Sequence, residues 1–311
     1  MSEDFWIEKL NNSRTLTHRL ELLDDVECPE YLLDIMISHD IEQDVVRKAS
    51  KHPNCSTDLK NKALVRLKKL DYSSENFAIC PIPWTHIAIQ QNGDYRICCQ
   101  NIYKPFGKLN NNNDIASIFN TSINEARNLP ELNELRRSMI KGEKHSLCNL
   151  CYTEELNGLH SKRQYMLKRY NISSMLDNTN KDGEIDTEIL PLKYIDIRFG
   201  NLCNLKCRYC GPTDSSLWYD DYAVLSGQDS TPMPFYGSKT YTITKKDNRF
   251  VVDSLDFKWY EQKSFWTQMK ELIPYIDRYY FTGGEPTINK IHFELLELII
   301  CLLYTSDAAD D

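Results

Sequence analysis

Three cysteines in one short segment could together hold a metal centre. They occur in the run Cys203-Asn-Leu-Lys-Cys207-Arg-Tyr-Cys210, a C-x3-C-x2-C spacing that directly follows a predicted strand at residues 193–199. Three thiolates on one loop can bind a 4Fe–4S cube and leave its fourth iron without a protein ligand. Structural zinc sites take a fourth protein ligand, and no histidine or further cysteine lies nearby in the sequence. The spacing therefore favours an iron–sulfur cluster with one open iron.

A second motif follows the next predicted strand, at residues 278–281, and reads Thr282-Gly-Gly-Glu-Pro286. Two glycines expose backbone groups to a close ligand, and the carboxylate of Glu285 complements an ammonium group. In an α/β barrel the chemistry lies at the carboxyl ends of the strands. We therefore expect this turn to lie beside the cysteine loop.

Together these motifs resemble the signature of the radical S-adenosylmethionine (SAM) enzymes, including the aromatic Tyr209 before the third cysteine. The resemblance implies that the three cysteines bind a 4Fe–4S cluster whose open iron chelates SAM, with Tyr209 near the adenine. It implies reductive cleavage of SAM to a 5′-deoxyadenosyl radical that abstracts hydrogen from a substrate. The second motif would supply the SAM-binding residues Gly283, Gly284, Glu285 and Pro286, with the carboxylate receiving the SAM amino group.

A further set of cysteines lies upstream. Cys80, Gly93 and Cys98 follow a C-x12-G-x4-C spacing that resembles the opening of SPASM and twitch auxiliary-cluster domains. Cys148 and Cys151 would complete four thiolates, which satisfy either zinc or a fully ligated 4Fe–4S cluster. The resemblance favours iron. A cluster closed by four thiolates cannot bind substrate directly, so we expect an electron-transfer or a structural role.

The order of these segments departs from the usual family pattern, in which the auxiliary domain follows the barrel. The runs Cys80-Pro-Ile-Pro-Trp84 and Arg136…Lys141-Gly-Glu…Cys148 resemble a group of twitch-containing radical SAM proteins with this reversed order. Strand alternation places Cys99 opposite Cys98, so we interpret Cys99 as the spare thiol. We interpret His86 and His145 as residues that support a ligand from behind or lie on the surface, and not as ligands themselves.

Hydrophobic periodicity indicates the elements that must position these motifs. Cys28 and Cys55 begin two similar helical stretches, and we interpret them as small core residues of a HEAT-like repeat. Hairpins are expected at Asn92-Gly93 and Asp247-Asn248. Helices are expected at 132–140, 265–276 and 291–300. The expected domains are a helical segment at 1–74, a cysteine-rich α+β twitch-like domain at 75–165, a linker at 166–190, the front of the radical SAM core at 191–300 and a non-native tail at 301–311.

The fold class expected is therefore α/β: an incomplete radical SAM partial (β/α) barrel, preceded by the twitch-like domain and the helical segment. The tail resembles sequencing-adapter readthrough, so the native chain is expected to continue beyond about residue 300. About two of the six β/α units of the complete core are present. We expect the chain by itself to be inactive or weakly active, and no acid, base or radical-bearing residue can be named from it.

Composition restricts the cellular setting and the partners. The formal net charge is −8 at pH 7, which argues against a general affinity for nucleic acid. No apolar run approaches the roughly 18 residues of a membrane span, and the N-terminus lacks the apolar core of a signal peptide. Without an export signal, eleven cysteines favour metal binding over disulfides. We therefore expect a cytoplasmic protein.

The resemblance implies an electron donor such as flavodoxin or ferredoxin, and analogy with auxiliary-cluster relatives points to a peptide or protein substrate. Two alternatives stay open from the sequence. One is a non-catalytic, zinc-stabilised binding module with no SAM affinity. The other is a radical SAM enzyme that acts on a small metabolite or sugar.

Overall fold

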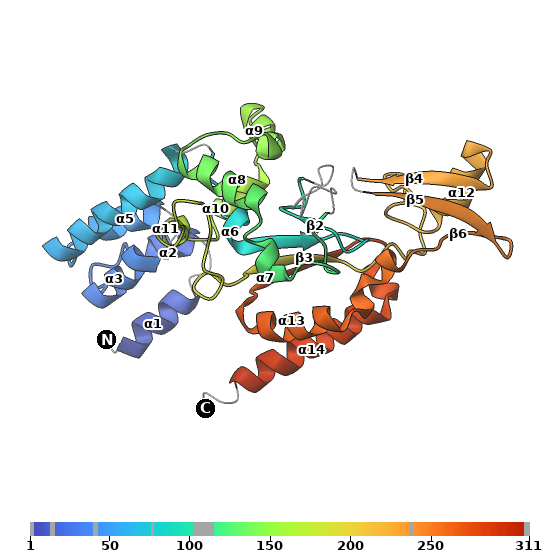
Figure 1. Cartoon of the computed structure of the whole chain (residues 1–311). Coiled ribbons are helices and arrows are strands. Elements are labelled where there is room, and N and C mark those ends of the chain that lie inside the picture. The colour runs from blue at the N-terminus through green and yellow to red at the C-terminus, as the bar shows by residue number, and fades with distance from the viewer. Residues whose placement is uncertain are drawn as a thin grey trace. The chain divides into compact units, whose positions relative to one another are not determined.

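The computed structural model describes residues 3–12, 16–39, 43–75, 78–101, 115–236 and 239–307. The chain forms two compact units, shown in Figure 1. Unit 1 comprises residues 1–81 and 160–177, and unit 2 comprises residues 82–159 and 178–311. The secondary structure is mixed α/β, as the sequence predicts.

Unit 1 is helical in its described parts, which agrees with the helices expected in the N-terminal segment. Each of the two similar stretches begins with the same turn, because the backbone N–H groups of Cys28 and Cys55 donate to the carbonyls three residues earlier. The side chain of Asn54 links the two turns by donating to the carbonyl of Cys28 at 2.9 Å. The helices are α1 (Glu3–Asn12), α2 (Leu16–Leu22), α3 (Glu30–His39), α4 (Gln43–Ser50), α5 (Thr57–Glu75), α10 (Lys162–Leu167) and α11 (Ile172–Asp177).

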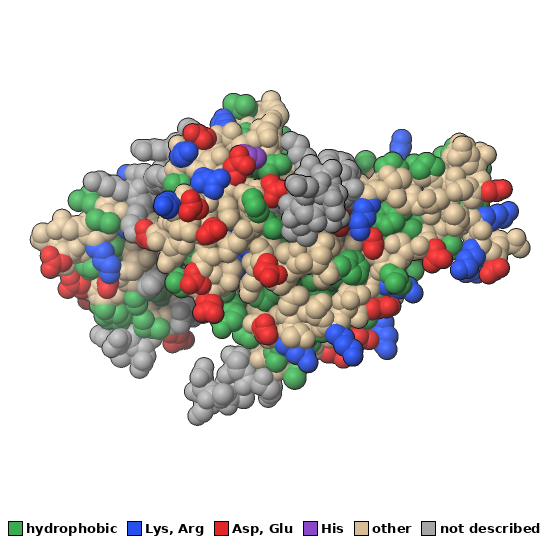
Figure 2. All heavy atoms as spheres, viewed as in Figure 1, with side chains coloured by type: hydrophobic (Ala, Val, Ile, Leu, Met, Phe, Trp, Pro, Cys, Tyr) green, Lys and Arg blue, Asp and Glu red, His purple; other side chains and the backbone are tan. Residues whose placement is uncertain are grey.

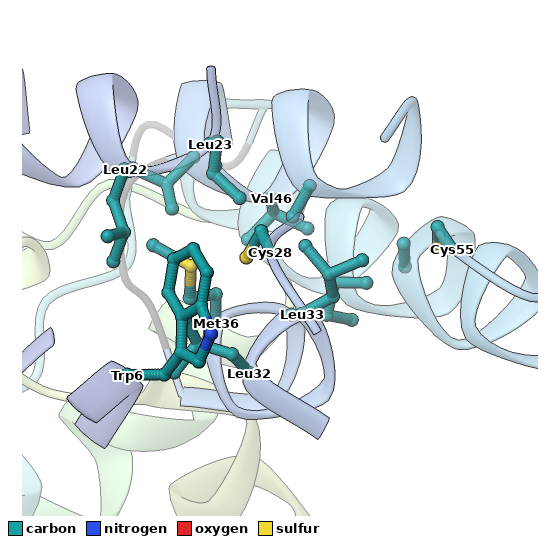
Figure 3. Close-up of a cluster of buried hydrophobic side chains, with 13 residues drawn as sticks. Trp6, Leu22, Leu23, Cys28, Leu32, Leu33, Met36, Val46 and Cys55 are labelled. Atoms are coloured by element: carbon teal, nitrogen blue, oxygen red, sulfur yellow. The ribbon is translucent and has the colours of Figure 1, made fainter. Parts of the chain in front are cut away.

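The core of unit 1 contains both of these cysteines, as the sequence predicts. Cys28 is 0% exposed and Cys55 is 4% exposed. Figure 3 shows Cys28 among apolar side chains that include Trp6 and Val46. Burial raises the pKa of Cys28 to about 11, and burial also raises the pKa of Cys55. Both thiols therefore act as small apolar core groups.

Unit 2 is built on a four-stranded sheet with the order β2-β1-β3-β7. Its strands are β1 (His86–Ile89), β2 (Tyr95–Arg96), β3 (Tyr194–Arg198) and β7 (Arg278–Thr282). The β1–β2 hairpin confirms the turn predicted at Asn92-Gly93. β1 also pairs in parallel with β3, and β3 pairs in parallel with β7. The sequence did not predict that the hairpin shares a sheet with the two later strands.

Two helices, α13 (Lys263–Leu272) and α14 (Lys290–Asp307), lie along one face of this sheet (Figure 1). The predicted helices at 132–140, 265–276 and 291–300 correspond to α8, to α13 with η3, and to α14. The bounds are α6 (Ile82–Thr85), α7 (Ile123–Ala126), α8 (Pro130–Ile140), α9 (Asn149–Leu156), α12 (Trp218–Ser226), α13 (Lys263–Leu272) and α14 (Lys290–Asp307), with the 3-10 helices η1 (Ser146–Cys148), η2 (Leu255–Glu261), η3 (Ile273–Tyr275) and η4 (Pro286–Ile288). Helix α14 thus enters the segment 301–311, whose last four residues lie outside the described ranges.

A three-stranded antiparallel sheet is inserted between β3 and β7, and we call it the insertion sheet. It consists of β4 (Ser230–Phe235), β5 (Lys239–Lys246) and β6 (Arg249–Val252) in that order. The β5–β6 hairpin confirms the turn predicted at Asp247-Asn248, where both residues adopt positive φ. β4 was not predicted because Pro232 and Pro234 oppose a strand assignment. Its edge position tolerates them, since an edge strand needs no second row of N–H donors.

Charge is distributed without a dominant patch on the face drawn in Figure 2, where lysine and arginine side chains are interspersed with aspartate and glutamate. Within the described ranges, the structure contains no helix with both the length and the apolar character that a membrane crossing requires.

Thiol burial leads to a test of the unit 1 core. In cluster-free native protein, brief alkylation at pH 8 should label the exposed Cys301 and spare Cys28 and Cys55. A pKa of about 11 leaves only about 0.1% of Cys28 as the reactive thiolate at that pH. Mass spectrometry of peptides would measure the labelling, with urea-unfolded protein as the control. Equal labelling of Cys28 and Cys301 in native protein would contradict the buried assignment.

Candidate functional site

The loop after β3 and the turn after β7 lie side by side at one end of the sheet. We call residues 199–217 the cysteine loop and residues 282–286 the glycine turn. The last residue of β3, Arg198, pairs with Thr282 at the end of β7. The N–H of Gly284 donates to the carbonyl of Asp214 at 3.0 Å, and the N–H of Glu285 donates to the carbonyl of Leu202 at 2.8 Å. The two sequence motifs are therefore joined by backbone hydrogen bonds.

The two glycines of the turn are required by this close contact. Gly283 has φ +83° and Gly284 has φ +58°, both in the region that disfavours other residues. A Cβ atom on Gly284 would lie 2.1 Å from the carbonyl oxygen of Leu202. A Cβ atom on Gly283 would lie 2.6 Å from the Cβ atom of Arg198. The turn can approach the cysteine loop and the end of β3 only because both side chains are absent.

The three thiols of the cysteine loop influence one another and are open to solvent. Cys207 is exposed, and Cys203 and Cys210 are partly exposed. The pKa of Cys210 is raised, first by burial, then by the charges of Asp214, Cys207 and Cys203 and by a hydrogen bond with Cys207. Tyr209, between two of the thiols, is 100% exposed. The loop thus presents three thiols and an aromatic ring to an incoming ligand.

The carboxylate of Glu285 is held in an ionised state at the start of η4. Its Oε1 atom accepts from the hydroxyl of Thr287 at 2.5 Å and from the backbone N–H of Thr287 at 3.1 Å. These two hydrogen bonds, in that order, lower the pKa of Glu285. Pro286 is the first residue of the same short helix. A carboxylate kept negative on an exposed turn suits a cationic partner.

Asp214 connects the cysteine loop to two other elements. Its Oδ1 atom accepts from Nε2 of Gln91, which lies in the turn after β1, at 2.7 Å. Its Oδ2 atom accepts from the hydroxyls of Tyr236, at 2.6 Å, and Thr213, at 3.1 Å. Burial, followed by the hydrogen bond to Asp214, raises the pKa of Tyr236. Tyr236 itself has φ +40°, a strained conformation for a residue with a side chain.

The hairpin cysteines lie at the other end of the sheet. Because β2 runs antiparallel to β1, Cys98 and Cys99 follow β2 toward the end where β1 and β3 begin. The first residue of β1, His86, bonds through Nδ1 to the carbonyl of Ile97 at 2.9 Å. Burial, followed by the charge of Cys99, raises the pKa of Tyr194, the first residue of β3. The length of β3, about 15 Å at the usual rise per residue, therefore separates these thiols from the cysteine loop.

The C-x2-C pair lies where η1 meets α9. Cys148 ends η1 and Cys151 lies in the first turn of α9, so a spacing of three places both on one side of the helix. The imidazole of His145 accepts the N–H of Leu147 and caps η1. Cys80 belongs to unit 1, whereas Cys98, Cys148 and Cys151 belong to unit 2.

Both proposed ligand sets stay predictions at this stage. Within the described ranges, no three or more His, Cys, Asp or Glu side chains are grouped so that they could hold a metal ion.

Two buried arginines fix the chain path around the hairpin. Arg136 on α8 donates to the carbonyls of Pro83, Arg127 and Gly183. Arg127 donates to the carbonyl of Trp84 at 2.7 Å. Burial, followed by the charge of Arg127, lowers the pKa of Arg136 to about 9, and burial lowers the pKa of Arg127 to about 10. Both guanidinium groups donate hydrogen bonds to backbone carbonyls, and their role is therefore structural.

Sequence reasoning missed Gln91, Asp214 and Tyr236 as members of one cluster. Gln91 immediately precedes the predicted hairpin turn, and Asp214 lies in the loop after the third cysteine. Nothing in the local sequence indicates that these residues meet, because their contact requires the parallel pairing of β1 with β3.

The contact between loop and turn predicts the effect of enlarging a glycine. Gly284→Ala should lower the free energy of unfolding by about 3 kcal/mol, because it adds a steric clash to the cost of the left-handed backbone. Gly227→Ala is the matched control, since Gly227 has φ +66° but open space around its Cβ position. It should cost about 1 kcal/mol. Urea unfolding followed by tryptophan fluorescence would measure both, and equal losses would refute the close contact.

The hydrogen bonds of the buried arginines predict that two adjacent substitutions differ in their effect on stability. Arg136→Ala should lower the free energy of unfolding by about 4 kcal/mol, because it leaves several buried carbonyls without a donor. The adjacent Arg137→Ala should cost less than about 1 kcal/mol, since its hydrogen bond to the carbonyl of Asp182 is exposed. Circular dichroism during urea unfolding would measure the difference. A small loss for Arg136→Ala would show that water replaces the guanidinium.

Comparison with known proteins finds one similarity, in the segment that contains the upstream cysteines. No curated protein and no solved structure matches the chain. Residues 80–152 match the family model SPASM, described as an iron-sulfur cluster-binding domain. The match covers less than a quarter of the chain and includes Cys80, Cys98, Cys148 and Cys151. Residues 80–152 are therefore similar to an iron–sulfur cluster-binding domain of the kind associated with radical SAM proteins.

Proposed function

We propose that the chain is a radical SAM enzyme, or part of one, with an auxiliary iron–sulfur cluster. The observation that carries this proposal is the contact between the cysteine loop and the glycine turn. Glu285 and Gly284 bond through their backbone N–H groups to the cysteine loop, at the carboxyl ends of two parallel strands. Ligands of α/β sheets bind at this end of the strands.

The thiols of Cys203, Cys207 and Cys210 would hold the cluster. They are three thiols on one loop, each at least partly open to solvent, and this supports them as the ligand set. With SAM bound, such a cluster supplies one-electron cleavage to methionine and a 5′-deoxyadenosyl radical, which removes hydrogen from a substrate. The loop's task is to leave one iron open, which three ligands achieve and four would prevent.

The glycine turn would bind SAM. The backbone of Gly283 and Gly284 is free of side chains, and the ionised carboxylate of Glu285 complements an ammonium group. The exposed ring of Tyr209 is available to pack against an adenine. Strands β3 and β7 would be part of an incomplete (β/α) barrel.

The upstream set, Cys80, Cys98, Cys148 and Cys151, would bind a second 4Fe–4S cluster. The family match to residues 80–152 supports iron over zinc. Because Cys98 follows β2 toward the opposite end of the sheet from the cysteine loop, this second cluster would be remote from the radical chemistry. We therefore propose that the second cluster transfers electrons or supports the fold. The proposed electron donor of the enzyme is a flavodoxin or a ferredoxin. The proposed substrate is a peptide or protein.

Metal analysis after anaerobic reconstitution tests the proposal. The chain should bind roughly eight irons with matching sulfide, and the triple variant Cys203→Ala, Cys207→Ala, Cys210→Ala should retain about four. Cys301→Ser, which alters an exposed cysteine outside both sets, should retain all of them. Reduction in the presence of SAM should give at most a small amount of 5′-deoxyadenosine, because the chain is expected to be weakly active by itself, and the triple variant should give none.

Each other outcome has a distinct meaning. About four irons with one zinc would keep the radical SAM site and make the upstream set structural. Zinc without labile sulfide would overturn the proposal and favour a zinc-stabilised binding module.

A further inference from the structure

The carboxylate of Asp214 is held by hydrogen bonds from three segments of unit 2. Gln91 comes from the turn after β1 and is fully buried, Tyr236 follows β4 of the insertion sheet, and Thr213 is the neighbouring residue in the cysteine loop. All three groups donate to the carboxylate. A carboxylate with donors from three segments is held in one orientation.

The same residue is placed close to the thiols. Its backbone carbonyl accepts the N–H of Gly284, so Asp214 lies at the junction of the cysteine loop and the glycine turn. Its backbone N–H donates at 3.0 Å to the carbonyl of Gly211, the residue that follows Cys210. The nearby cation Arg198 is paired at 3.3 Å with Asp196, so its charge is already compensated.

We propose that Asp214 is a positioning residue that supplies a fixed negative charge and lowers the reduction potential of the cluster bound by the cysteine loop. This inference rests on the proposed function. Adding an electron makes the cluster more negative, and a carboxylate held nearby opposes that change. Net charge around a cluster is one of the main determinants of its potential. A lower potential makes the reduced cluster a stronger electron donor to a bound substrate.

A redox titration of the reconstituted full chain tests this assignment. Electron paramagnetic resonance would follow the reduced cluster, and the signal altered by added SAM identifies the cluster of the cysteine loop. Asp214→Asn keeps the shape of the side chain and removes its charge. The ratio of reduced to oxidised cluster at a fixed potential should rise about tenfold, which equals a shift of about 59 mV for one electron. Asp214→Ser, a smaller neutral variant, should shift the potential in the same direction.

Two controls separate charge from local damage. Asp253→Asn removes the same charge from a highly exposed position and should leave the potential unchanged. Tyr236→Phe keeps the charge of Asp214 and removes a donor that partly neutralises it, so its potential should equal or fall below that of the wild type. A rise in Tyr236→Phe as large as that in Asp214→Asn would assign the effect to loss of structure and overturn the inference.

The remaining outcomes distinguish this inference from the proposed function. If the wild-type chain takes up no iron and sulfide, the proposed function fails. If the cluster assembles and both neutral variants of Asp214 retain the wild-type potential, the proposed function stands and the role of Asp214 is refuted.

Discussion

The parallel pairing of β3 with β7 is the constraint on which the candidate site depends. The pairing sets Arg198 opposite Thr282, so the cysteine loop and the glycine turn begin at the same level of the sheet. The N–H of Glu285 can then reach the carbonyl of Leu202. A register shift of one residue would move the turn by about 3.3 Å and break this bond. The chemistry expected of the two motifs therefore depends on strand register as much as on the motif residues.

The same end of the sheet receives a third loop from the segment that matches the SPASM family. β1 lies parallel to β3, and Gln91 in the turn after β1 reaches Asp214 in the cysteine loop. The hairpin of the SPASM-like segment and the candidate SAM site thus share one sheet. Strand direction also places Cys98 and Cys99 toward the opposite end, so the sheet itself keeps the two groups of thiols apart.

Local signals allowed much of the fold to be predicted, and non-local pairing accounts for the rest. Asn92-Gly93 and Asp247-Asn248 indicate hairpins because these residues tolerate positive φ, and both hairpins form. β4 was hidden by Pro232 and Pro234, which are acceptable only at a sheet edge that the sequence does not reveal. The motifs predicted the contact between cysteine loop and glycine turn. Gln91 could not be assigned, because its contact with Asp214 joins residues 123 positions apart.

The buried arginines supply a physical reason for the parallel register of β1 and β3. Arg127 donates to the carbonyl of Trp84, shortly before β1, and to the carbonyl of Leu190, shortly before β3. One rigid guanidinium therefore holds the starts of both strands at one level. Burying a cation costs free energy, and neutral carbonyls offset that cost less than a carboxylate would. An apolar side chain in place of Arg127 would pack there without specifying the register of the strands. The hydrogen bonds of the buried Arg127 therefore favour the one alignment of β1 and β3 that brings Gln91 to Asp214, at the cost of burying a cation.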